Sequence, residues 1–200
     1  MGSCIIAKGL KTCTLALAAY AGIALAQVDA ARSAYEREDY TAAVSLYAPR
    51  AAAGDAEAQY RMGMMARFGW GMDKDTAAAV RWLSAAARQN QAQAQAELGA
   101  MYRLGRGVPE DAREAARLLT AAALAGVGIA QLSVGRMYRD GIGVDRDLVE
   151  AYAWFSAAGD NNVMDGLAYR SEIVKEMSPE QIAEGKRRAA QRTRKENEAK

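Results

Sequence analysis

The chain offers few side chains for acid–base or nucleophilic chemistry. It has no histidine, which excludes a Ser-His-Asp triad, a Cys-His pair and a histidine-based zinc site. Three carboxylates cluster at Glu36, Glu38 and Asp39, and a pair of carboxylates can hydrolyse a glycosidic bond. These acids fall in an expected turn between two helices, where no pocket is implied. We therefore expect no catalytic residue, no metal ligand and no cofactor.

A second set of side chains suits binding. Arg67, Arg103 and Arg139 recur every 36 residues, so they are expected to form a ladder along neighbouring helices. Arginine binds carboxylates bidentately, and apolar residues beside the ladder can bury an anchor residue. We therefore predict a surface for an acidic or amphipathic protein or peptide. Its candidate residues are Tyr60, Met64, Arg67, Phe68, Trp70, Arg103, Arg136 and Arg139.

Each of these candidates also has a structural interpretation. The arginines can pair with neighbouring acids and merely solvate their helices. Trp70 lies between Gly69 and Gly71, where the later copies carry Arg106 and Ile142. It either anchors a partner or folds back over the N-terminal part of the array. The sequence leaves both alternatives open.

The elements that position these residues repeat with the same period. Eleven of the 36 positions hold the same residue in all three copies, and Gly63, Gly99 and Gly135 mark the frame. Self-similarity at this period indicates stacked helix pairs. The chain contains 46 alanines and only 7% aromatic residues, which favours closely packed helices over a β-sandwich or barrel.

The sequence predicts that each repeat forms two helices joined by a tight turn. Ala58, Met62 and Ala66 share one face of the first helix, and the recurrence of Gly63 implies close approach of a neighbouring helix. A Gly-x-Gly turn follows, in which glycine allows positive φ. The aspartates of the second helix are expected N-caps, and two of them have a glutamate three residues later, which predicts capping boxes. These N-caps are Asp75, Asp111 and Asp147, and the glutamates are Glu114 and Glu150.

The two ends differ from the repeats. Ser178, Pro179 and Gln181 predict the start of a separate helix that caps the array. The basic stretch from Lys186 to Lys200 is expected to fray into solvent, and any membrane contact is expected through it. The predicted organisation is a signal peptide at 1–26, an N-terminal partial repeat at 27–53, repeats at 54–89, 90–125 and 126–161, and a C-terminal partial repeat, capping helix and basic tail at 162–200.

The first 26 residues resemble a secretory signal peptide. Lys8 and Lys11 precede an apolar run that ends in Ala24-Leu25-Ala26, so we expect cleavage before Gln27 and a periplasmic or secreted protein. An uncleaved N-terminal anchor is the alternative. Cleavage removes both cysteines and two lysines, which leaves 24 basic and 24 acidic residues. Without excess positive charge, no nucleic-acid partner is expected.

The segment from Ala94 to Gly126 closely resembles the Sel-one-like repeat, a relative of the tetratricopeptide repeat. Residues 126–159 match with Tyr138, Val144 and Trp154, whereas in residues 54–89 Ala66 replaces the tyrosine and Met72 the valine. The resemblance implies an all-α solenoid, a right-handed superhelix of helix pairs, and an adaptor that holds other proteins on its concave face. Some exported bacterial members are envelope regulators.

The predicted function is therefore a non-catalytic, exported scaffold for protein–protein interaction or envelope regulation. The alternative is a peptidoglycan- or β-lactam-directed hydrolase or binding protein of the cell envelope. A cysteine-rich branch of the family is linked to β-lactam binding, but this chain would carry no cysteine after cleavage. The sequence does not indicate the oligomeric state.

Overall fold

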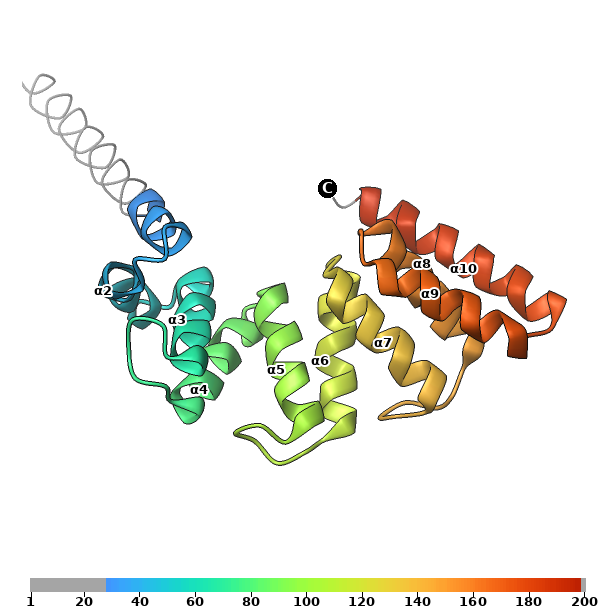
Figure 1. Cartoon of the computed structure of the whole chain (residues 1–200), viewed down its shortest axis with the longest axis horizontal. Helices are drawn as coiled ribbons and strands as arrows, with labels where there is room; N and C mark the ends of the chain where they lie inside the picture. The colour runs from blue at the N-terminus through green and yellow to red at the C-terminus, as the bar shows by residue number, and fades with distance from the viewer. Residues whose placement is uncertain (1–27, 199–200) are drawn as a thin grey trace, which may run out of the picture.

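The computed structural model describes residues 28–198, and all regular secondary structure in that range is helical (Figure 1). Residues 28–36 form the first described helical segment. The helices that follow are α2 (Tyr40–Ala52), α3 (Ala56–Phe68), α4 (Thr76–Arg88), α5 (Ala92–Leu104), α6 (Ala112–Leu124), α7 (Gly128–Asp140), α8 (Leu148–Asp160), α9 (Met164–Ile173), the short 3-10 helix η1 (Val174–Glu176) and α10 (Pro179–Glu198). The signal peptide predicted at 1–26 lies outside the described residues.

The helices pack as consecutive pairs, which confirms the predicted all-α solenoid. Helices α3 and α4, α5 and α6, and α7 and α8 form the pairs, while α4 packs on α5 and α6 on α7 to join them. The array bends into an arc whose two ends rise on the same side (Figure 1). None of the helices within residues 28–198 is long and apolar enough to span a bilayer.

The glycine of each first helix is required by close packing, as the sequence predicted. A Cβ on Gly63 would lie 2.7 Å from Leu83 Cγ, and one on Gly99 would lie 2.8 Å from Leu119 Cγ. In the third repeat, a Cβ on Gly135 would lie 2.5 Å from the Phe155 ring. These distances are far below van der Waals contact, so each second helix presses a large apolar side chain onto the backbone of the first.

The predicted N-caps are confirmed, but the two capping boxes are not. The carboxylates of Asp75, Asp111 and Asp147 accept backbone N–H bonds at the starts of α4, α6 and α8. The N–H groups of Asp111 and Asp147 donate to the carbonyls of Tyr102 and Tyr138 at 3.0 and 2.9 Å. In a capping box, Glu114 or Glu150 would accept a hydrogen bond from the backbone N–H of the N-cap aspartate. That N–H is already bound to a carbonyl of the preceding helix, so the box does not form. Ser178 and Gln181 do form a reciprocal capping box at the start of α10.

A buried glutamine joins each helix pair to the pair before it. The side-chain amides of Gln59, Gln95 and Gln131 each donate to a carbonyl at the end of the preceding helix at 3.2 Å. The amide oxygens of the first and third glutamines also accept hydrogen bonds, from Gln89 at 2.8 Å and from Asn161 at 3.0 Å. Gln89 and Asn161 each lie 30 residues after the glutamine that they bind. The residue 30 positions after Gln95 is Ala125, whose side chain cannot donate a hydrogen bond.

We expect Ala125→Asn to raise the free energy of unfolding by about 1 kcal/mol, because it supplies the hydrogen bond that Gln95 lacks. Ala125 has φ −81° and ψ 7°, close to the φ −91° and ψ 26° of Asn161, so the backbone already suits the new residue. Urea unfolding followed by circular dichroism measures the change. Ala53→Asn, at the C-cap of α2, is the control for the helix-end effect of asparagine alone. Equal stabilisation by both substitutions would contradict the prediction.

The C-terminal basic stretch is ordered against the array, so the prediction that it frays is wrong for its described part. Helix α10 packs along α8, and Arg188 and Arg192 both bind the carboxylate of Glu150. The guanidinium of Arg192 lies 4.1 Å from the centroid of the Trp154 ring. These two arginines lie on the face of α10 that contacts α8. The last two residues of the predicted tail, 199–200, lie outside the described range.

Candidate binding surface

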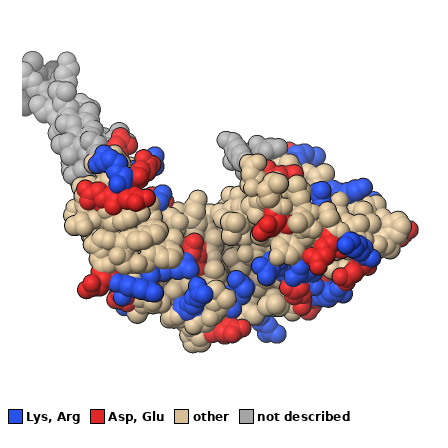
Figure 2. Space-filling view, in the orientation of Figure 1, with Lys and Arg blue, Asp and Glu red and all other residues tan. Residues whose placement is uncertain are grey.

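The predicted binding residues lie on the first helices of the three repeats and on the turn after α3. Arg67, Arg103 and Arg139 each occupy the last turn of their helix, α3, α5 and α7. A cation in this position offsets the partial negative charge of a helix C-terminus. Figure 2 shows basic side chains gathered along the lower edge of the molecule, where these helices end, with acidic side chains between them.

Two arginines of the ladder already have partners within the chain. Arg67 on α3 forms an ion pair with Glu97 on α5. Arg139 binds both oxygens of Asp140, at 2.7 and 3.0 Å, and lies 5.1 Å from the centroid of the Tyr169 ring. These hydrogen bonds to the charged form hold the pKa of the Asp140 carboxyl below its usual range. Arg67 and Arg139 therefore have a structural role whatever else they bind.

Arg103 and Arg136 differ from the other two arginines. Both are exposed, and neither forms an ion pair with another side chain of the described residues. The Arg136 guanidinium lies 5.6 Å from the centroid of the Tyr169 ring, and this is a weaker contact than a salt bridge. The two guanidinium groups line one cavity of about 160 Å³ between α5 and α7.

A second cavity, of about 220 Å³, lies next to the first and is more apolar. Ala96 and Ala100 of α5 and Ile129 of α7 line it, together with Tyr60 of α3 and Leu119 of α6. The pKa of Tyr60 is raised by burial of its side chain. Ser133 lines both cavities, so they lie side by side, and we call the two together the α5–α7 groove.

The aromatic candidates lie at the N-terminal end of the array. Trp70 stacks on Tyr40, with ring centroids 5.1 Å apart, and on Phe68, with centroids 4.8 Å apart. Tyr35 meets the Trp70 ring edge-on. Trp70 thus folds back over the N-terminal helices, which is one of the two alternatives that the sequence left open. Phe68 is 47% exposed, so contact of this aromatic cluster with a partner stays a prediction. Met64 lies half-buried on α3, between Tyr60 and Arg67.

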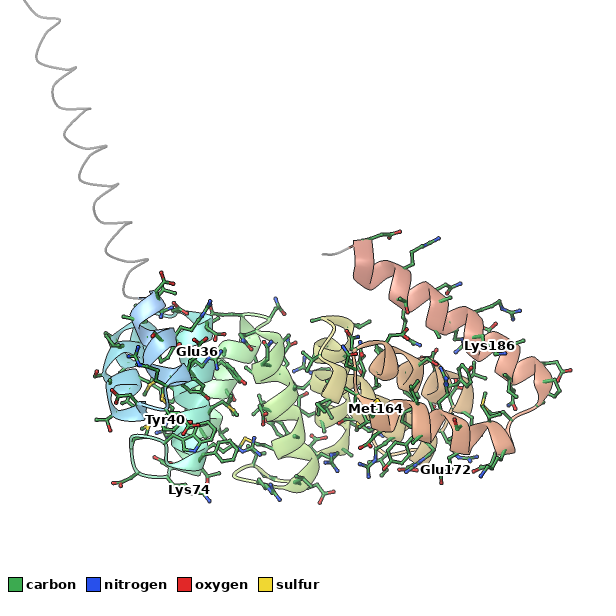
Figure 3. The ribbon with its side chains drawn as sticks, turned by 45° about the horizontal axis from the view of Figure 1, so that its top comes forward. Glu36, Tyr40, Lys74, Met164, Glu172 and Lys186 are labelled. Carbon is green, nitrogen blue, oxygen red and sulfur yellow. The ribbon has the colours of Figure 1, made fainter. Side chains whose placement is uncertain are left out.

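The carboxylates first considered for catalysis lie at the exposed end of the helical segment 28–36 and in the turn that follows it before α2. Asp39 caps that helix by accepting the Ala42 N–H at 3.1 Å, and Glu36 and Glu38 are exposed. Figure 3 shows Glu36 and Tyr40 on the N-terminal helices, at the opposite end of the array from Lys186 on α10. Within the described part of the chain, no three Asp, Glu, His or Cys side chains are grouped to hold a metal ion.

Solved structures of known proteins resemble this array. A protective antigen of uropathogenic Escherichia coli strains with an SLR fold is 34% identical, with a TM-score of 0.72 over 77% of this chain and 33% of that chain. A Sel1 repeat protein from Oxalobacter formigenes is 26% identical, with a TM-score of 0.68 over 72% of this chain and 59% of that chain. The chain thus matches a third and about three-fifths of the lengths of these two proteins. No curated protein matches the sequence significantly.

The family model for the Sel1 repeat matches three consecutive segments of 36 residues, at 56–91, 92–127 and 128–163. Each segment holds one complete helix pair, α3–α4, α5–α6 and α7–α8. Sel1 repeat proteins are generally scaffolds for protein–protein interaction. The repeat match covers more than half of the chain and the helix-pair fold agrees with it, so the chain belongs to the Sel1 repeat family.

Proposed function

We propose that the chain is an exported, non-catalytic scaffold that binds a segment of a partner protein in the α5–α7 groove and acts in the cell envelope. The observation that carries the proposal is the groove itself, where an apolar cavity lies beside a cavity lined by two arginines that form no ion pair within residues 28–198. Small residues on α5, Ala96 and Ala100, leave room there for a ligand side chain. Binding surfaces of repeat proteins commonly lie along one face of the stacked elements.

Export is supported by the N-terminal sequence and by a structural relative. Lys8 and Lys11, the apolar run after them and the small residues before Gln27 form the pattern of a secretory signal peptide. The relative from uropathogenic Escherichia coli is a protective antigen, a description that fits a protein outside the cytoplasm. Action in the envelope, as a regulator or adaptor, follows from export.

The groove suits a binding role better than a catalytic one. Its walls carry arginines and apolar side chains, and the carboxylates that line its cationic half are Glu110 and the Arg139-bound Asp140. A peptidoglycan- or β-lactam-directed hydrolase would need a nucleophile or a general base that reaches the bound substrate. The half-buried Ser133 is the hydroxyl shared by both cavities, and it donates its proton to the Ile129 carbonyl at 2.9 Å.

Affinity capture from envelope extracts tests the proposal. We expect the C-terminally tagged full-length chain to be recovered with Gln27 as its first residue and to retain a partner protein. Ala100→Trp, which fills the groove, should reduce capture about tenfold, equivalent to about 1.4 kcal/mol of binding free energy. Ala77→Trp, at an exposed position of α4, is the matched control and should capture normally.

Three results would contradict this proposal. They are recovery of the chain only from the cytosol at full length, equal capture by both tryptophan variants, and turnover of peptidoglycan or a chromogenic β-lactam by the purified protein. Melting temperatures of both variants should stay near that of the original chain, since neither position is in the core.

A further inference from the structure

The three ladder arginines, Arg67, Arg103 and Arg139, differ in the side chain that the next repeat places beside them. The position 30 residues after each arginine is Glu97, Ser133 or Tyr169. Glu97 supplies a carboxylate to Arg67, and Tyr169 supplies an aromatic ring to Arg139. Ser133 supplies no charged acceptor to Arg103, and its hydroxyl donates to the Ile129 carbonyl of its own helix at 2.9 Å. At this repeat position Arg103 therefore lacks the side-chain partner that Arg67 and Arg139 have.

The same place holds a second cation. Helix α7 carries Arg136 where the equivalent position of α5 is Ala100. Both Arg103 and Arg136 line the 160 Å³ cavity. Two acids also line it, but Asp140 is held by Arg139 through two hydrogen bonds, and Glu110 forms no ion pair with either arginine. Within residues 28–198, Arg103 and Arg136 therefore line this cavity without an ion pair to either of its two acids.

The apolar half of the groove begins about two helical turns away. From Arg136 back to Ile129 is seven residues along α7, or about 10 Å. Ile129 is 65% exposed, and the cavity beside it has Leu119 of α6 among its lining residues. Covering this apolar surface with a ligand side chain is favourable because it removes that surface from water. The groove therefore offers an apolar binding site near Ile129 and a cationic binding site near Arg136, about 10 Å apart along α7.

We infer that the α5–α7 groove recognises an extended peptide through a carboxylate that binds Arg103 and Arg136 and an apolar side chain that packs beside Ile129. The ligand carboxylate takes the place that Glu97 fills one repeat earlier. An extended chain rises about 3.3 Å per residue, so the two ligand residues are about three positions apart. This inference rests on the proposed function, and it adds the chemistry of the partner segment.

Fluorescence anisotropy with the full chain and labelled peptides tests the inference. The probe is a labelled peptide containing Leu-Ser-Ser-Glu within a Gly-Ser flank, and its matched partner has glutamine in place of the glutamate. We expect the glutamate peptide to bind about tenfold more tightly, equivalent to about 1.4 kcal/mol, because one carboxylate can accept hydrogen bonds from both arginines. That preference should disappear when Arg103→Gln and Arg136→Gln are combined.

A third variant fills the site from within the chain. Ser133→Glu places a carboxylate on α7 at the position that Glu97 occupies on α5, so it should pair with Arg103 and weaken binding of the glutamate peptide about tenfold. The control combines Arg88→Gln with Arg113→Gln, two exposed arginines on α4 and α6, and should bind like the original chain. It removes the same net charge from outside the groove.

The inference is overturned if the two peptides bind equally, if neither binds at millimolar concentration, or if the control variant loses as much affinity as the groove variant. These outcomes are distinct from failure of the proposed function. If the full chain still captures a partner protein and Ala100→Trp abolishes this capture, the groove binds a segment of different chemistry. If no partner is captured at all, the proposed function itself fails.

Discussion

Replacing Gly143 with alanine should lower the free energy of unfolding by about 3 kcal/mol. Gly143 is the second glycine of the turn after α7 and has φ +73°, which costs a non-glycine residue about 1–2 kcal/mol. A Cβ at this position would also overlap the carbonyl oxygen of Ala112 and lie 2.6 Å from its carbonyl carbon. Because that obstacle is backbone at the start of α6, relief requires the two repeats to move apart, which adds about 1–3 kcal/mol. Urea unfolding followed by circular dichroism measures the loss.

The first glycine of the same turn provides the control. Gly141 has a similar φ of +70°, but a Cβ there would lie 3.5 Å from the Arg146 Cβ, an ordinary van der Waals contact. Gly141→Ala should therefore cost only the backbone term, about 1 kcal/mol. Equal losses from the two variants would show that positive φ, and not contact between repeats, explains the second glycine.

This difference between the two glycines shows what the sequence can predict. Recurring glycines separated by one residue indicate a turn with positive φ, and both glycines adopt it. The pattern does not show that the second glycine touches the preceding repeat, because spacing within one turn says nothing about which other element approaches. Close packing at Gly63 is predictable because a recurring glycine inside a helix lowers helix propensity and needs a compensating contact.

The candidate site was predicted in part for the same reason. The identical arginines stand out from the repeat, and the structure places them on successive helices as expected. The residue that the next repeat places beside each of them differs between the copies, and these residues are Glu97, Ser133 and Tyr169. A search for repeat positions that hold the same residue in every copy does not find this position. The one signal that could have revealed Arg103 as the arginine without a partner is the comparison of residues 30 positions downstream of each arginine.

The sequence predicted a separate capping helix from Ser178, but the docking of its basic part on α8 was missed because the partner residue lies far away in the sequence. The sequence pattern around Glu150 indicates a local capping box, and the basic residues near the C-terminus resemble a solvated tail. Arg188 and Arg192 are four residues apart, so they share one face of a helix. A helix with two cations on one face can be expected to bind an acid, but periodicity alone does not identify that acid as Glu150 on α8.

Glu150→Ala should lower the free energy of unfolding by about 3 kcal/mol, because it leaves the poorly solvated Arg192 without its carboxylate and removes one of the acids that bind Arg188. The side chains of Glu150 and Arg192 are only 18% and 19% exposed. Arg188 binds one oxygen of Glu150 at 2.5 Å, and Arg192 binds the other. Arg192 also lies over the ring of Trp154. Loss of the carboxylate should therefore weaken attachment of α10 to α8, and amide hydrogen exchange in α10 should become faster.

Glu114→Ala is the matched control, since Glu114 occupies the equivalent position one repeat earlier and likewise follows an aspartate N-cap. Its carboxylate binds Arg117, whose side chain is 65% exposed, three residues along the same helix. Loss of such an exposed pair costs about 0.5 kcal/mol. Any effect of removing an acid from the first turn of a helix is common to both variants, so the difference between them measures the attachment of α10. If the two variants unfold at the same urea concentration and α10 exchanges no faster in Glu150→Ala, the ion pairs seen on α8 contribute no stability, and Gly185 packing on Tyr152 must hold α10 in place.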